Sequence, residues 1–273
     1  MRIDYLSSDI LLFRGDSLAA LATAFIDGER ALLVDVPASQ FDAIDVRDYL
    51  EATLHKRVTR IVLTDRAGAH PGALAMFPGA ELTCPASLTH GPAQLLWGRH
   101  TLALHPDGAA LRVDAPEADL LFVGDSIVGN IALLGAHAPD QADQSLVRLL
   151  DRGRQRIVPR HMGAVCNRAL GNARAYLARL RARVLALRTT LAPGDAAVAI
   201  ARIPIEQCLV DGEWATPLER HWHADNLKRI VANGWYPAAA GAAPARRSRT
   251  QACCDTVASV LTAMLGRLVE RGV

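Results

Sequence analysis

The sequence predicts an α/β fold followed by a helical segment, and three features of its pattern indicate this. Short apolar runs bounded by polar breaks recur between residues 10 and 159, as is typical of strands. Residues 41–54 carry apolar side chains at helical spacing between two such runs, which makes a strand–helix–strand unit. From Asn167 onward, residues that favour long helices dominate.

Each expected element follows from its local pattern. Strands are expected at residues 10–13, 22–26, 31–36, 60–64, 81–83, 101–104, 110–113, 120–123 and 156–159. The last strand ends at Pro159, because proline cannot donate a ladder hydrogen bond. Helices are expected at residues 41–54, at 141–150, and from 167 to the break at Pro193.

These elements divide the chain into three parts. Residues 1–166 are expected to form the core domain, and residues 167–236 a helical extension packed on it. Residues 237–273 are interpreted as a linker and an amphipathic tail helix. The apolar stripe of that tail makes a homodimer a hypothesis. The stripe consists of Val257, Val260, Leu261, Met264 and Leu268.

Composition excludes several classes of protein. The 273 residues carry a net charge of +2 and are 51% hydrophobic and 21% charged, which argues against disorder and against a strongly basic nucleic-acid binder. The three arginines Arg246, Arg247 and Arg249 are interpreted as a solvated part of the linker, so no nucleic-acid partner is expected.

The sequence contains no apolar run of the roughly 18 residues that a membrane helix needs, so no membrane partner is expected. No segment of signal-peptide type begins the chain, and a cytoplasmic location is the default expectation. The five cysteines show no paired framework and are expected to be reduced thiols.

Potential metal ligands follow the expected strands at the points where loops from a rigid scaffold can converge. Asp65 and His70 follow the strand at 60–64. His105 follows 101–104, Asp125 follows 120–123, and His161 follows 156–159. Imidazole and carboxylate groups suit Zn, Fe(II) or Mn.

The order of these segments resembles that of the metallo-β-lactamase superfamily over roughly residues 5 to 165. The segment ALLVDVP, with Asp35, looks like an early family strand that ends in Asp, and LLFVGDSI resembles the family's GD motif. HPDG resembles the loop that bears the third histidine, and VPRHMG the terminal GHG loop. The resemblance implies a four-layer αββα sandwich with the site at one edge. Residues 167–236 look like the subgroup of sulfur-oxidation and quinoprotein-relay hydrolases.

The chain departs from the family's THxHxDHxGG signature, where it has TDRAGAHPGA. Asp65 stands in place of the first histidine, and Ala67 and Ala69 in place of the second histidine and the aspartate. By the resemblance, the retained metal ligands are His70, His105, Asp125 and His161. At most one ion is expected, held chiefly by His70, Asp125 and His161, with Asp65 and Asp125 as the catalytic carboxylates.

Two functions follow from this degenerate ligand set. One is a mononuclear metal-dependent hydrolase of an ester, lactone or thioester, with zinc as the first choice of ion, Fe or Mn as alternatives, and Asp65 replacing the lost carboxylate as orienting base. The other is a metal-free, non-catalytic member of the fold that binds a small molecule or a partner protein. Substrate identity is beyond the sequence, because a fold does not dictate function.

Each candidate residue also has a structural interpretation. His70 and Asp125 could cap local turns, His161 could lie on a surface loop, and HPDG is an ordinary turn sequence. Asp65 could form a surface ion pair with the adjacent arginine. His221 and His223 cannot chelate together, because helical positions i and i+2 do not share a face, and we expect at most one to point inward. Residues 88–100, with Trp97, are placed at the cleft mouth by position alone.

Overall fold

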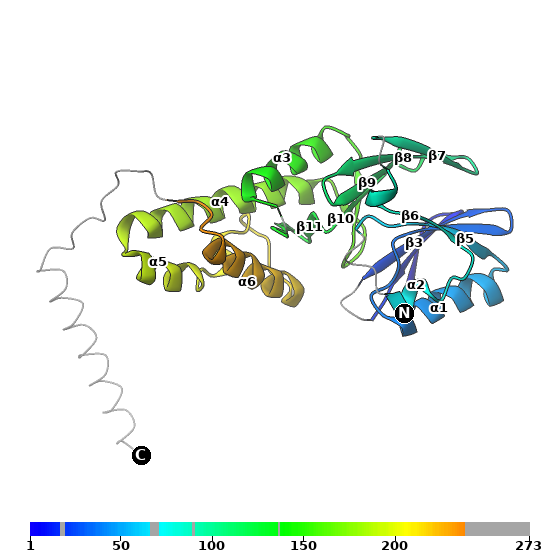
Figure 1. The fold of residues 1–273 in the computed structure, drawn as a ribbon, viewed down its shortest axis with the longest axis horizontal. Helices are drawn as coiled ribbons and strands as arrows, with labels where there is room; N and C mark the ends of the chain where they lie inside the picture. Colours follow the sequence, from blue (N-terminus) through cyan, green and yellow to red (C-terminus); the bar gives the residue numbers. More distant parts are fainter. Residues whose placement is uncertain (17–19, 66–70, 89–90, 136, 238–273) are drawn as a thin grey trace, which may run out of the picture.

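The chain folds into two six-stranded sheets that face each other, with helices on their outer faces and a helical extension at one end (Figure 1). The expected α/β four-layer sandwich is therefore confirmed. The coordinates are a computed structural model, and the structure describes residues 1–16, 20–65, 71–88, 91–135 and 137–237.

The first sheet has the order β1-β2-β3-β4-β5-β6. Its first four strands pair antiparallel, whereas β4, β5 and β6 run parallel to one another. Helix α1 connects β4 to β5, as the strand–helix–strand pattern predicts. The strands are β1 (Arg2–Ser7), β2 (Ile10–Arg14), β3 (Leu21–Asp27), β4 (Arg30–Val34), β5 (Arg57–Val62) and β6 (Glu81–Thr83).

The second sheet has the order β14-β13-β10-β9-β8-β7, and β10 and β13 are its parallel pair. A separate two-stranded hairpin, β11 (Ile127–Val128) and β12 (Ile131–Ala132), follows β10. The strands are β7 (Ala93–Trp97), β8 (His100–Asp107), β9 (Ala110–Ala115), β10 (Leu120–Gly124), β13 (Arg156–Pro159) and β14 (Val165–Cys166).

Six α-helices complete the described fold. Ser39 caps the first of them by accepting a hydrogen bond from Asp42 N, and a π-helical turn, Tyr49–Thr53, extends it, so together they cover the helix expected at 41–54. Thr216 and Glu219 form a capping box at the start of the last. The helices are α1 (Gln40–Asp48), α2 (Pro71–Leu74), α3 (Pro139–Leu150), α4 (Arg168–Thr190), α5 (Pro193–Ile200) and α6 (Pro217–Ala232).

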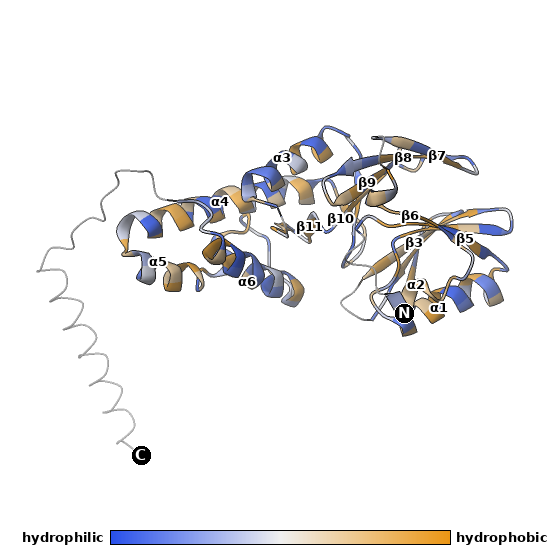
Figure 2. Cartoon of the chain, in the orientation of Figure 1, coloured by the Kyte–Doolittle hydropathy of each residue, from blue (hydrophilic) through white to orange (hydrophobic). Residues whose placement is uncertain are grey.

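Three apolar clusters hold these layers together, and the apolar colouring of Figure 2 follows the faces that meet. One cluster, which includes Phe25 and Phe122, fills the space between the two sheets. A second lies between the first sheet and helices α1 and α2. The third joins the second sheet to α3 and to the extension. The helical extension is thus continuous with the core in packing.

A buried polar network fixes the extension to the β11–β12 hairpin. Asn226 Nδ2 donates to Ala132 O (2.8 Å) and to the Tyr176 hydroxyl (3.1 Å). The Tyr176 hydroxyl is 2.8 Å from His223 Nδ1, and His223 Nε2 donates to Ile203 O at 2.9 Å. Burial lowers the pKa of His223, consistent with a neutral ring that accepts at Nδ1. His223 is buried and His221 exposed, which fits the expectation that at most one points inward.

Two sequence expectations need correction. The edge strand β1 lies outside the expected set, because its alternating polar residues hide its apolar content. Trp97 does not line a cleft mouth: it lies on β7, is 6% exposed in the core between the sheets, and donates through Nε1 to Phe25 O at 2.9 Å. The indole is buried because its N–H finds a partner there.

Cys84, Cys166 and Cys208 are free thiols. Within the described residues, no helix is long and apolar enough to cross a membrane. The linker and the tail helix expected at 237–273 fall almost wholly outside the described residues, so their structure stays a prediction.

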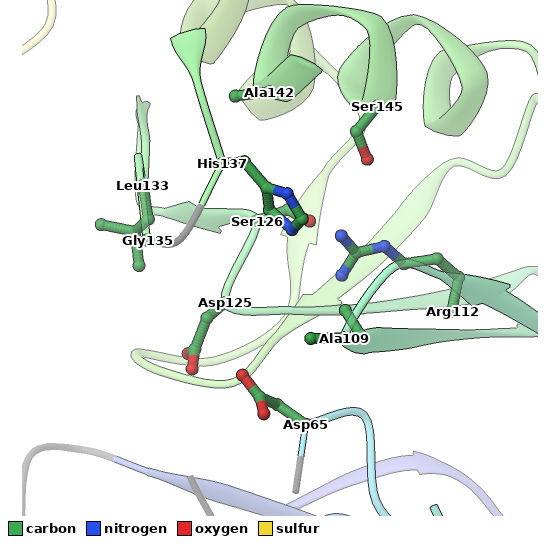
Figure 3. A pocket seen from close by; sticks show the side chains of 11 residues that line it. Asp65, Ala109, Arg112, Asp125, Ser126, Leu133, Gly135, His137, Ala142 and Ser145 are labelled. Atoms are coloured by element: carbon green, nitrogen blue, oxygen red, sulfur yellow. The ribbon is translucent and has the colours of Figure 1, made fainter. Parts of the chain in front are cut away.

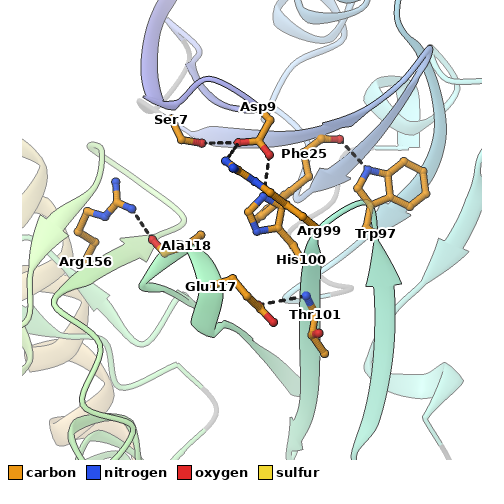
Figure 4. A network of polar contacts seen from close by, with 10 residues as sticks. All are labelled: Ser7, Asp9, Phe25, Trp97, Arg99, His100, Thr101, Glu117, Ala118 and Arg156. Carbon is orange, nitrogen blue, oxygen red and sulfur yellow. Dashed lines mark hydrogen bonds and ion pairs between the residues drawn. The ribbon is translucent and has the colours of Figure 1, made fainter.

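An ion pair joins the two sheets at the edge shown in Figure 4. Asp9, in the turn before β2, faces His100 Nε2 at 2.9 Å and Arg99 at 2.6 Å, and it accepts the Ser7 hydroxyl at 2.7 Å. Burial acts to raise the pKa of Asp9, but the hydrogen bonds from Arg99, Ser7 and His100, with the charge of His100, lower it to about 2. The ionised carboxylate therefore stabilises the folded state.

We expect Asp9→Asn to lower the free energy of unfolding near neutral pH by about 2 kcal/mol. Because the folded-state pKa is about 2 against an ordinary value of 3.8, this contribution is fully present above 3.8 and is lost as the pH falls through 2. Urea denaturation at several pH values measures it, with Asp48→Asn, an exposed carboxylate, as control. A difference between Asp9→Asn and wild type that stays constant down to pH 2 would contradict this account.

Candidate active site

The carboxyl ends of β5 and β4 are tied together by one buried contact. Asp35 follows β4 in a left-handed conformation (φ 60°), and both of its oxygens accept hydrogen bonds from Thr64, at 2.8 Å from the amide and 2.7 Å from the hydroxyl. Burial raises the pKa of Asp35, and the charge of Arg160 and the Thr64 bonds oppose this. Asp35, which the ALLVDVP segment predicts at the end of an early strand, therefore positions the loop that carries Asp65.

The same loop reaches across to the second sheet. Leu111 N donates to Thr64 O at 2.7 Å, and Asp65 forms an isolated β-bridge with Ala110. At the end of β10, Gly124 adopts φ 53°, and a Cβ there would lie 2.8 Å from Thr64 Oγ1. Only glycine permits both the conformation and the close approach. Gly124 thereby brings Asp125 beside the end of β5.

The structure brings Asp125 and His161 together. Arg160 N donates to Gly124 O at 3.0 Å, which holds the loop after β13 against the end of β10. His161 is 5% exposed, and its Nε2 lies 3.4 Å from Asp125 Oδ1. That oxygen is buried and accepts no hydrogen bond from the described residues. The centroid of the Trp222 ring, from α6, lies 6.2 Å from that of the His161 ring, so the extension lies beside this histidine.

A cavity of about 100 Å³ opens beside Asp125. Figure 3 shows the carboxylates of Asp65 and Asp125 turned toward each other at one side, with Arg112 and His137 across from them. Ser126 also lines the cavity, and its buried hydroxyl has no hydrogen-bond partner among the described residues. The cavity thus combines two carboxylates, an imidazole and a guanidinium.

Arg112 is the charged residue that the sequence did not single out. It lies on β9, is 8% exposed, and donates through Nη1 to Val123 O at 2.5 Å. Burial lowers its pKa, whereas the charges of Asp107, Asp125 and Asp65 raise it. Its signal in the sequence is weak, because a single arginine inside an apolar strand is more often at the surface.

Other sequence-predicted residues are placed differently. His105 lines a separate cavity beneath α3, with Asp107 and Arg152, and does not line the cavity beside Asp125. His70 lies outside the described residues, so its proposed ligation stays a prediction. His137, which shows no ligand spacing in the sequence, lines the cavity from the segment that precedes α3.

Asp125 and His161 are spaced to bind a single divalent ion, but two donors alone do not complete its ligand set. Two ligands about 2.1 Å from a tetrahedral ion lie about 3.4 Å apart. The distance between His161 Nε2 and Asp125 Oδ1 has this value, which is long for a hydrogen bond between nitrogen and oxygen. In residues 1–16, 20–65, 71–88, 91–135 and 137–237, no group of three or more His, Cys, Asp or Glu side chains is arranged to hold a metal. The candidates for a third ligand are Asp65, which lines the cavity, and His70, which lies outside the described residues.

Comparison with known proteins gives the fold. No family model and no curated protein matches the sequence. Among solved structures, a metallo-β-lactamase from Pontibacter korlensis is similar with a TM-score of 0.55 and 15% identity, over 65% of this chain and 98% of that one. TMB-1 gives a TM-score of 0.53 and 14% identity over 63% and 94% of the two chains.

A further similar structure is FIM-1 from Pseudomonas aeruginosa in its mono-zinc form, with a TM-score of 0.51 and 15% identity over 63% of this chain and 92% of that one. The matches cover most of each solved structure and about two thirds of this chain. The subgroup suggested by the helical extension stays a prediction. At these identities the likeness establishes architecture, and the chain therefore has the metallo-β-lactamase fold.

Proposed function

We propose that this protein is a mononuclear metal-dependent hydrolase in which Asp125 and His161 hold one divalent ion. The observation that carries the proposal is the buried Asp125 Oδ1, which accepts no hydrogen bond within the described residues yet lies 3.4 Å from His161 Nε2. A buried carboxylate oxygen that accepts no hydrogen bond is costly, and an ion between the two donors would remove that cost.

Zinc is the first choice of ion, and Fe or Mn also suit an imidazole and carboxylate set. FIM-1 in its mono-zinc form is a precedent for one ion on this fold. When bound, such an ion polarises a carbonyl oxygen and lowers the pKa of a coordinated water to about 7. The remaining ligand positions would be completed by Asp65 or by His70, which the sequence pattern places in the loop after β5.

Asp65 would serve as the orienting base. Its carboxylate faces that of Asp125 across the cavity, and the β-bridge to Ala110 fixes its backbone. In hydrolysis, water adds to the acyl carbon and the bond to the oxygen or sulfur leaving group breaks. The proton that Asp65 accepts from the water then passes to the leaving group, which balances the reaction.

Arg112 would stabilise negative charge that develops on the substrate. Its guanidinium is buried, points into the cavity in Figure 3, and is held in place by Val123 O. A fixed positive group in a site from which water is largely excluded lowers the energy of an oxyanion. Small esters, lactones and thioesters are the substrate classes proposed for a cavity of this size.

A second candidate is a metal-free protein that binds a small molecule in the same cavity. The observation that favours it is the buried Arg112, whose charge already acts on Asp65 and Asp125. A guanidinium can offset two carboxylates in part without any ion. The experiment that follows distinguishes the two functions.

We expect purified wild-type protein to hold about one equivalent of zinc after incubation and desalting, because Asp125 and His161 are ligand types that zinc prefers and Asp65 or His70 would supply the third ligand. Asp125→Ala and His161→Ala should each lose most of this metal. His221→Ala, which removes an exposed histidine, should keep it. Elemental analysis by mass spectrometry measures the content.

If wild type stays metal-free after incubation with zinc, Fe(II) and Mn, the proposed hydrolase function is wrong and the proposed ligand-binding function is supported. Two equivalents would show that the retained residues rebuild a second ion site. The same metal analysis of His70→Ala and His105→Ala tests the remaining predicted ligands, since each variant loses metal only if its histidine is a ligand.

For Asp65→Asn in the zinc-loaded enzyme, we expect kcat/KM on an active ester, lactone or thioester to fall about 100-fold or more, because the amide cannot accept the proton. Metal content should stay near one equivalent if Asp65 acts as base and not as ligand. Asp195→Asn, an exposed carboxylate in α5, is the control. An unchanged kcat/KM would remove Asp65 from the mechanism.

A further inference from the structure

A second cavity, of about 240 Å³, lies between α3 and the outer face of strands β8 and β9. Successive side chains along these strands point to opposite faces of the sheet, and this explains why the cavity is polar. Leu104, Leu111 and Val113 point into the core between the sheets, so His105 and Arg112 point to the opposite face. That face would ordinarily be apolar beneath a helix, and here it is charged.

Positive charge is in excess around this cavity. Three arginines, Arg112, Arg148 and Arg152, line it together with one carboxylate, Asp107. Asp107 is already saturated: it accepts Ser145 Oγ at 2.5 Å, Arg148 Nη2 at 2.8 Å and Arg112 Nη2 at 3.4 Å. Arg152 makes no ion pair within the part of the chain that the structure describes.

Two buried nitrogen atoms at this cavity have no hydrogen-bond partner among the described residues, His105 Nε2 and Arg112 Nε. A buried polar atom without a partner costs free energy, and Arg112 is more than nine-tenths buried.

We propose that this cavity binds a small oxyanion, a phosphate or carboxylate group, between His105, Arg152 and Arg112. An oxyanion supplies the acceptor atoms that these nitrogen atoms lack and offsets the excess positive charge. His105 then belongs to an anion site behind the Asp125 cavity. Arg112 and Ser145 line both cavities and therefore connect the two sites physically.

The test is isothermal titration of the full-length, chelator-treated protein with inorganic phosphate and, separately, with malonate, at low salt. Removal of metal makes the result independent of the proposed hydrolase site. We expect one saturable site, weakened about tenfold or more by Arg152→Gln and by His105→Gln. Arg202→Gln, which removes the same charge from an exposed position in the extension, should bind like wild type.

The imidazole ¹⁵N signals of wild type provide a second measurement, in which the His105→Gln variant serves only to assign the signal. Phosphate should shift the signal that His105→Gln removes. The anion that binds more tightly, phosphate or malonate, is the type that the site prefers, and a preference for either one supports the proposed oxyanion site. Absence of saturable binding for both anions, or equal binding by wild type and Arg152→Gln, would overturn the proposal.

Discussion

Thr64 is the residue on which the geometry of the site depends. Its amide and hydroxyl hold Asp35, its carbonyl accepts Leu111 N, and its hydroxyl leaves room for no side chain at position 124. Three strand ends from two sheets therefore meet at one fully buried side chain. Because the sheets are locked at this edge, Asp65, Asp125 and His161 are held on a rigid frame.

The charges around the cavity determine which ions this site can bind. Asp65 and Asp125 face the same cavity, and Arg112 is the buried cation beside them. Asp107 accepts hydrogen bonds from Ser145 and Arg148 and also pairs with Arg112 at 3.4 Å, so Arg112 shares its positive charge with this third carboxylate. A divalent ion between Asp125 and His161 would complete the balance at the cavity, and an oxyanion beneath α3 would balance the outer face of the same sheet.

The sequence predicts the fold well, because the strand and helix periodicities are strong in the core. Trp97 was misplaced, since one aromatic residue near a turn does not reveal which side of an edge strand it occupies. The proximity of Asp125 and His161 could be predicted from their positions after parallel strands β10 and β13. The separation of His105 could not, because one position along a strand changes the face to which a side chain points.

The proposed chemistry requires that Asp125 and His161 share one ion. X-ray diffraction from zinc-soaked crystals, with data collected on both sides of the zinc absorption edge, tests it directly. We expect one anomalous peak about 2.1 Å from both Asp125 Oδ1 and His161 Nε2. An anomalous peak elsewhere on the protein, or none at this position in crystals that contain zinc, would contradict it.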